Sequence, residues 1–366
     1  MPLKFWLGGA SSDKSRRLIK YILDEAEKNP QRQYLVVVPE QFGLSTQQEL
    51  VKSSPRKGIL NIDVLSFTRL AHRISDEVGS YASGITTLDD MGKSLLIGML
   101  ASKHKKDLKV FGDNLDKPGY TDRIKSVISE FMQYGITVEK AEELARKTGE
   151  AGRGLLAGKL SDIALIYGSF KEYTKDRYTT VEETLDAVSA LVPHSDTVKN
   201  SVIVFDGFTG FTPVQNKLIG VLMEYALDIH VALLLEDCIQ EKAENAQLKE
   251  HELFYLSKHT MNQLGRMADE RHVVIEDPYK AHEHGISNTC YSKGEIAYTG
   301  TENRKKLNNT TERPAVRVFA GRNPSEEVKM VCGAISDLVA GKGYRYRDIA
   351  ILTGDRKSTR LNSSHL

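Results

Sequence analysis

The sequence predicts an α/β protein whose first domain is a parallel sheet of the phosphate-binding-loop (P-loop) type. Three observations predict it: an apolar strand that runs directly into a degenerate P-loop, apolar runs that alternate with amphipathic helices, and a later strand that ends in an acidic residue. A long helical stretch interrupts the strands, so we also expect a large all-helical insertion. Strand signals restart near the end of the sequence, which predicts the start of a second α/β domain.

The first strand, residues 3–7, leads into Gly8-Gly9-Ala10-Ser11-Ser12-Asp13-Lys14-Ser15 and then an amphipathic helix. In the template G-x-x-x-x-G-K-[ST], loop N–H groups cradle phosphates, the lysine reaches the outer phosphates and the hydroxyl ligates Mg²⁺. Gly8, Lys14 and Ser15 fit, but Asp13 replaces the second glycine. Aspartate tolerates the left-handed backbone region, yet we expect its carboxylate to lie where polyphosphate charge belongs. ATP and Mg²⁺ are therefore the ligands of a site that we predict to be weakened or lost.

Composition limits the classes of function. The 366 residues leave room for two or three domains, and 50 basic against 49 acidic residues give a net charge of +1. No global field would draw such a chain to nucleic acid or membrane, so any DNA contact must come from a local patch. Cys238, Cys290 and Cys332 lack metal-site or disulfide spacing, and no signal or membrane-spanning pattern occurs. We expect a cytoplasmic protein without a resident metal in this region.

Two further strands follow the first helix. Residues 33–39 form an apolar run of the buried parallel type, and Glu40 and Gln41 come directly after it, at the carboxyl edge where α/β proteins place ligands. Residues 61–66 predict a third strand, with Ser66 capping a helix over 67–74.

Strand signals then stop, and amphipathic helices fill residues 86–192. The aromatic and aliphatic stripes of this region predict a helical core rather than a ligand site.

The sheet resumes with a strand at 201–208, a helix from Pro213 and a strand at 229–236. Asp206 ends the first of these strands and is the carboxylate expected on the Mg²⁺ side of the nucleotide. Hydrolytic helicases follow such an aspartate with a glutamate that orients the attacking water, whereas this chain has Gly207. The metal-side carboxylate is present and the catalytic base is missing.

The remaining sequence predicts a domain boundary. After a long helix, about residues 244–271, a polar region over 278–313 contains His282 and His284, which we interpret as ordinary loop histidines. A strand (315–319), a helix (324–340) and a strand (348–352) begin a second domain, residues 314–354, that two strands and one helix cannot complete. Residues 355–366 resemble a translated sequencing adapter and are expected to be non-native. The first domain is thus expected over 1–85 and 193–277.

Several motifs together resemble one family. They are the N-terminal P-loop strand, VVVPEQ (36–41), LSFTRLA (65–71), the helical insertion, FDGFTGFTP (205–213) and GYRYRDIAIL (343–352). In this order they resemble AddB, the family of B subunits of the bacterial AddAB helicase-nuclease, over residues 1 to about 354. The family's loop commonly reads G-x-x-G-S-G-K-[ST], so Ser11 and Asp13 replace two of its glycines.

The resemblance implies a superfamily 1 helicase-like architecture and a role in DNA double-strand break repair and homologous recombination. It implies an AddA partner subunit that drives translocation, while the AddB-like chain scans single-stranded DNA near a duplex end for the recombination hotspot Chi. The family's nuclease residues and iron–sulfur cluster belong to a C-terminal domain beyond this sequence.

At positions that match the family motifs, Gln41, Phe67, Arg69 and Phe208 are the candidate DNA-binding residues. Single-stranded DNA needs aromatic faces for stacking and polar groups for base edges and phosphates. The alternative interpretation makes Phe67 and Phe208 core residues and Arg69 a surface ion-pair partner. Two other functions also remain open: an active P-loop ATPase or nucleotide kinase that tolerates Asp13, and a purely structural support for AddA.

Overall fold

The computed structural model describes residues 2–9, 12–55, 57–79, 86–115, 119–175, 177–235, 250–251, 254–280 and 319–352. The chain forms two compact units, Met1–Gly285 and Ile286–Leu366.

The first unit is built on one parallel sheet, as the sequence predicts. Its strands are β1 (Pro2–Gly8), β2 (Gln33–Val37), β3 (Ile62–Leu65), β6 (Ser201–Phe205), β7 (Asp228–Leu234), β8 (Val274–Ile275) and β9 (Tyr279–Lys280). Their order is β3-β2-β6-β7-β1-β8, with β9 also pairing β1, and every pair is parallel. The central strands are apolar and buried because helices cover both faces, as parallel sheets require. The α/β class is confirmed.

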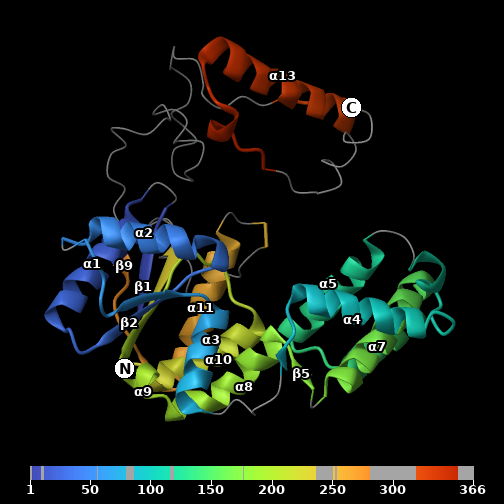
Figure 1. Ribbon diagram of the computed structural model, residues 1–366, viewed down its shortest axis with the longest axis horizontal. Helices are drawn as coiled ribbons and strands as arrows, with labels where there is room; N and C mark the ends of the chain where they lie inside the picture. The colour runs from blue at the N-terminus through green and yellow to red at the C-terminus, as the bar shows by residue number, and fades with distance from the viewer. Residues whose placement is uncertain are drawn as a thin grey trace. The chain divides into compact units, whose positions relative to one another are not determined.

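Helices cover the two faces of the sheet (Figure 1). They are α1 (Lys14–Lys28), the 3-10 turn η1 (Glu40–Phe42), α2 (Gly43–Ser53), α3 (Phe67–Val78), α8 (Val181–Leu191), the 3-10 turn η3 (Val192–His194), α9 (Asp196–Lys199), α10 (Pro213–Tyr225) and α11 (Tyr255–Glu270). One core lies between the sheet and helices α1 and α2, and includes Ile22 and Leu50. The other lies under α3, α8, α10 and α11, and includes Leu70 and Leu218.

Chain direction explains this division. The connections from β1 to β2 and from β2 to β3 run one way along the sheet, whereas those from β6 to β7 and from β7 to β8 run the other way. Because such connections are right-handed, the two groups of helices must lie on opposite faces. Strands β2 and β6 are neighbours, but the connection after β2 leads to β3 on one side and the connection after β6 leads to β7 on the other side. A topological switch point therefore lies between the carboxyl ends of β2 and β6. Open α/β sheets bind ligands at such points.

Some elements differ from the sequence-based expectations. Helix α2 follows η1 directly and was not anticipated, because Leu50 is its one buried residue. Strands β8 and β9 have two residues each, too few for a sequence pattern. The helix expected over 244–271 is observed as Tyr255–Glu270, and residues 244–249 lie outside the described part of the chain.

Between α3 and α8 the chain forms a helical cluster with its own core. Its elements are β4 (Thr86–Thr87), α4 (Asp90–Lys103), the 3-10 turn η2 (Gly112–Asn114), α5 (Tyr120–Gln133), α6 (Val138–Glu150), α7 (Gly154–Thr174) and β5 (Tyr178–Thr179). Ile97, Ile128 and Phe170 are among its buried residues. Helix α8 instead contributes Leu185 and Val188 to the core under the sheet. The limits 86 and 192 of an insertion remain a prediction.

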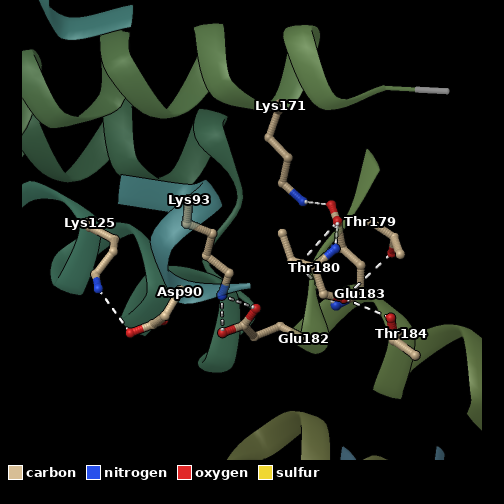
Figure 2. Close-up of polar contacts among 9 residues, drawn as sticks. All are labelled: Asp90, Lys93, Lys125, Lys171, Thr179, Thr180, Glu182, Glu183 and Thr184. Atoms are coloured by element: carbon tan, nitrogen blue, oxygen red, sulfur yellow. Dashed lines mark hydrogen bonds and ion pairs between the residues drawn. The ribbon is translucent and has the colours of Figure 1, made fainter. Parts of the chain in front are cut away.

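The two chain segments that lead into and out of this cluster pair with each other. Strands β4 and β5 form a parallel two-residue ladder. Beside it, Lys93 of α4 donates to both carboxylate oxygens of Glu182 of α8, at 3.1 and 2.9 Å (Figure 2). Both side chains are almost completely buried, so the pair ties the helical cluster to a helix of the sheet core.

The second unit contains α13 (Pro324–Lys342) and the 3-10 turn η5 (Tyr346–Asp348). Helix α13 begins at Pro324, as the sequence predicts; Asn323 caps it, and it has no buried residue. The strand predicted at 348–352 is wrong: the turn η5 includes Asp348, and Ile349–Leu352 pair with no described strand. An extended segment is a strand only when it pairs with another one. Most of the other strand predicted in this unit, residues 315–318, lies outside the described residues. The predicted non-native tail, residues 355–366, also lies outside them.

Within the described ranges, no helix has both the length and the apolar character needed to cross a membrane.

Candidate nucleotide and nucleic-acid site

The carboxyl edge of the sheet gathers most of the residues that the sequence singled out. Strand β1 ends before Lys14 and Ser15, β2 ends before Gln41, and β6 ends before Asp206. The carboxyl ends of parallel strands lie at one edge, so these segments meet although they are far apart in sequence. The register places β7 between β1 and β6.

The loop after β1 is held by its own backbone. Both the backbone N–H and the hydroxyl of Ser12 donate to the carbonyl oxygen of Gly9, at 3.2 and 2.8 Å. Ala10 and Ser11 lie outside the described residues. These two hydrogen bonds connect the end of β1 to the start of α1, and the N-terminus of a helix is the kind of site that binds anions.

Asp13 adopts an ordinary backbone conformation. Its φ is −84° and its ψ is 23°, outside the left-handed region, so an L-residue fits here without strain. Its carboxylate Oδ2 accepts from Nε of Arg17, one turn along α1, at 2.8 Å. The charge of Asp13 is thus partly neutralised by Arg17. The expected effect of this carboxylate on a bound polyphosphate remains a prediction.

Lys14, Ser15 and Asp206 converge across β7. The side chain of Lys14 lies inside the protein, with 9% of its surface exposed. Burial lowers the pKa of its ammonium group, and the nearby carboxylate of Asp206 opposes part of this shift. The Ser15 hydroxyl donates to Oδ1 of Asp206 at 3.3 Å, and the same oxygen accepts from the backbone N–H of Gly207 at 2.9 Å.

These groups supply part of what Mg²⁺ and a nucleotide need. Mg²⁺ prefers hard oxygen ligands and usually takes one or two carboxylates together with phosphates and water. The Ser15 hydroxyl and the Asp206 carboxylate are such ligands and lie side by side. Within the described part of the chain no cluster of three acidic, histidine or cysteine side chains could hold a metal by itself. The residues therefore fit an ion that arrives with phosphates, and Gly207 offers no side chain to activate water.

Phe67 and Phe208 belong to an aromatic cluster beside this edge. Phe67 is only 5% exposed and stacks on Phe205, with ring centroids 5.6 Å apart. Phe208 is half-buried and meets Phe67 edge to face at 5.5 Å, and Phe211 completes the cluster. Phe67 is therefore a core residue that packs against Phe208, and part of the Phe208 side chain is accessible at the surface.

Gln41 and Arg69 are exposed at the same edge. Gln41 lies in η1, directly after β2 and next to the switch point. Arg69 lies in the first turn of α3, where its backbone N–H donates to the cap Ser66 at 3.3 Å and leaves the guanidinium outside the helix. The roles of all four candidate DNA-binding residues remain predictions.

Phe42 was not among the residues predicted from the sequence. Its ring is 43% exposed and lies against Gly207: a Cβ added to this glycine would stand 3.4 Å from Cδ2 of Phe42. Gly207 has φ +80°, which turns the chain after Asp206. The sequence signal was available, since an aromatic residue follows Gln41 in the turn after a buried strand. Its meaning depended on knowing that β2 and β6 are neighbours.

The sheet and its edge define an α/β protein with a parallel, helix-covered sheet and a topological switch point, the position at which such sheets bind ligands. The family model described as ADDB, N-terminal, matches residues 5–294. The chain therefore belongs to the AddB N-terminal family.

Curated relatives agree with this assignment. Three of them, from different bacteria, are each named as the B subunit of an ATP-dependent helicase/deoxyribonuclease. The relative from Lachnoclostridium phytofermentans is 35% identical over 358 residues, which cover 97% of this chain and 30% of the relative. The relative from Heliobacterium modesticaldum is 31% identical, covering 98% and 29%, and that from Symbiobacterium thermophilum is 30% identical, covering 96% and 30%. The chain spans about 30% of the length of the curated relatives that it matches.

Proposed function

We propose that this chain is the helicase-like N-terminal part of an AddB-type helicase-nuclease protein that binds and scans single-stranded DNA. In this proposal it acts in double-strand break repair and homologous recombination, reads the hotspot Chi, works in the cytoplasm and pairs with an AddA-type partner. An iron–sulfur cluster and the nuclease residues would belong to a part of the longer protein that this chain does not contain. The names of the relatives support the general role.

The observation that carries the proposal is the position of Gln41 and Arg69. Both side chains are exposed at the carboxyl edge of the sheet, Gln41 after β2 and Arg69 in the first turn of α3 after β3. Arg69 offers five fixed N–H donors for phosphate oxygens, and Gln41 offers an amide for base edges. The partly exposed Phe208 lies on the same edge and adds an aromatic surface.

A binding titration tests the DNA part of the proposal. Fluorescence anisotropy of a labelled thymidine oligonucleotide would measure the affinity of the chain and of its Arg69→Ala variant. Removing one phosphate contact should reduce the slope of log affinity against log salt by about 0.7. Arg123→Ala, which removes an exposed arginine from α5, should leave the slope unchanged. Equal slopes for all three proteins would contradict the assignment of Arg69, and absence of binding would contradict the function.

We further propose that the nucleotide site is degenerate. Two features support this: Asp13 replaces a glycine, and Gly207 stands where a catalytic glutamate is expected. The second candidate function, an active ATPase, is favoured by one contact, the hydrogen bond between Ser15 and Asp206 that places two Mg²⁺-type ligands together.

Titration with a fluorescent ATP analogue and Mg²⁺ separates these two functions. A degenerate site predicts weak or undetectable binding by the unaltered chain and stronger binding by Asp13→Gly. Binding with a Kd of about 1 μM by the unaltered chain, lost in Lys14→Ala, would support the ATPase instead; such an affinity corresponds to about 8 kcal/mol.

A further inference from the structure

A serine, a histidine and an aspartate form a chain of polar contacts on the helical cluster. Oγ of Ser169, in α7, lies 3.0 Å from Nε2 of His104, and Nδ1 of His104 lies 3.3 Å from Oδ2 of Asp107. Ser169 is half-buried, and the side chains of His104 and Asp107 are 24% and 67% exposed. The proposed DNA-binding function uses none of these three residues.

The end of α4 sets this geometry. His104 caps α4, with its backbone N–H donating to the carbonyl oxygen of Leu100 at 3.1 Å, and α4 packs against α7. The backbone N–H of Asp107 donates to the carbonyl oxygen of His104 at 2.8 Å, and this turn brings the Asp107 carboxylate back to the ring. The imidazole therefore lies between a turn of its own chain on one side and α7 on the other.

The carboxylate determines which ring nitrogen carries the proton. A carboxylate only accepts hydrogen bonds, so Nδ1 of the neutral His104 ring must donate to Asp107. Nε2 then has a free lone pair and accepts from the Ser169 hydroxyl. Hydrolases activate a nucleophilic serine through the same order of groups: the imidazole takes the hydroxyl proton, and the carboxylate orients the ring and stabilises the imidazolium.

A hollow lies along the same face of α7. It has a volume of about 560 Å³, and its lining includes Ala145 of α6 and Ala157, Ala164 and Leu165 of α7. Leu165 lies four residues before Ser169, so the two side chains lie one above the other on the helix. The volume is within the range of small-molecule sites, about 300–1,000 Å³. A short apolar group can therefore lie in the hollow next to the helical turn that carries Ser169.

We propose that Ser169 is a base-activated nucleophile that accepts the acyl group of an activated ester with a short apolar acyl chain. Oγ of Ser169 forms a bond to the ester carbonyl carbon, and the hydroxyl proton passes to Nε2 of His104. The ester C–O bond then breaks, the leaving alcohol takes the proton from His104, and the acyl group stays on Ser169. Asp107 is a positioning residue, since it acts only through the ring.

The helix limits the reaction to this one step. In the interior of a helix the backbone N–H groups donate to carbonyl oxygens one turn earlier, so those around Ser169 cannot form an oxyanion hole. Hydrolysis of the acyl-serine is therefore slow, and the product is the acylated protein.

Labelling of the 366-residue chain with p-nitrophenyl butyrate, followed by peptide mass spectrometry, tests this activity. The butyryl group should appear on Ser169, and His104→Gln should slow its appearance about 100-fold or more, because general-base catalysis contributes about 10²–10⁴. Asp107→Asn should also slow it, since an amide can donate to Nδ1 and leave the proton on Nε2. The matched control is Ser161, which lines the same hollow but bonds to Lys109 at 3.4 Å instead of a histidine. It should be labelled about 100-fold more slowly than Ser169.

Two results would overturn the inference. The first is labelling of Ser169 no faster than that of Ser161; this comparison uses only the unaltered chain, so it does not depend on the folding of any variant. The second is an equal rate at Ser169 in the unaltered chain and in either His104→Gln or Asp107→Asn, because the serine would then react without its base or without the oriented ring. Both results leave the proposed DNA-binding function standing, since that function depends on other residues.

Discussion

At the scale of single residues, Gly207 shows how one backbone angle shapes the candidate site. Its φ of +80° lies in the left-handed region, and a Cβ there would meet its neighbours at 3.4 Å, an ordinary contact distance. Gly207→Ala should therefore destabilise through backbone strain alone, by about 1–2 kcal/mol. Gly207→Asn should cost less, because asparagine tolerates this region. Chemical denaturation measures the free energy of unfolding of both variants. A larger loss of stability in Gly207→Asn than in Gly207→Ala would contradict this prediction.

The lowered pKa of Glu77 predicts how the stability of the fold changes as the pH falls. Burial raises the pKa of its carboxyl, but hydrogen bonds from Ser195 and Thr197 outweigh burial and bring the pKa below its ordinary value of 4.5. The carboxylate accepts from the Ser195 hydroxyl at 2.5 Å and from the Thr197 N–H at 2.8 Å, where it caps α9. Because the folded pKa is depressed, this contribution is complete above pH 4.5 and is lost as pH falls through the lower, folded pKa.

The measurement is the thermal midpoint between about pH 6 and pH 3. Glu77→Gln removes the titrating group, so the variant should lose less stability over this range than the unaltered chain. Glu142→Gln, which removes an exposed glutamate from α6, is the control and should behave as the unaltered chain does. If the thermal midpoints of the unaltered chain and of Glu77→Gln fall by the same amount as the pH is lowered, Glu77 does not have this role.

At the scale of elements, the junction between the helical cluster and the sheet depends on a buried ion pair. Lys93 and Glu182 are 5% and 9% exposed, so solvent would not readily replace either partner if it were removed. Around them, Thr180 caps α8 through a capping box with Glu183, and Lys171 of α7 donates to Glu183 at 2.6 Å (Figure 2). Three helices thus meet around one helix start.

Removing one partner of this pair should be costly. Lys93→Met or Glu182→Leu alone leaves a buried charge and should destabilise by about 3–5 kcal/mol, whereas the double replacement should recover most of that loss. Urea denaturation with a double-mutant cycle measures the coupling. The exposed pair Arg146–Glu150 on α6 is the control, and its removal should cost less than about 1 kcal/mol. Additive losses at Lys93 and Glu182 would show that the two charges do not stabilise each other.

At the scale of the whole molecule, local sequence patterns predicted the sheet better than the site. Buried strands such as β6 are apolar runs that end at Asp206, and capped helices such as α3 and α10 begin with recognisable residues, so both can be found locally. Which strands lie next to each other in the sheet cannot be found from local sequence patterns. Phe42 acquires significance only because β2 lies beside β6. Likewise, Phe67 has an aromatic character that fits stacking, but its burial depends on Phe205 and Phe211 from another strand and loop.

The last prediction concerns the two units. The first unit has complete cores on both faces of its sheet, whereas α13 has no buried residue and an apolar hollow lies along it, lined by Met330, Ile335 and Ile351 among others. A chain ending at Gly285 should therefore unfold cooperatively with the thermal midpoint of the 366-residue chain. It should also aggregate less, because exposed apolar patches promote association. Calorimetry and light scattering on both chains measure this; a lower midpoint for the shorter chain would mean that residues 286–366 stabilise the sheet.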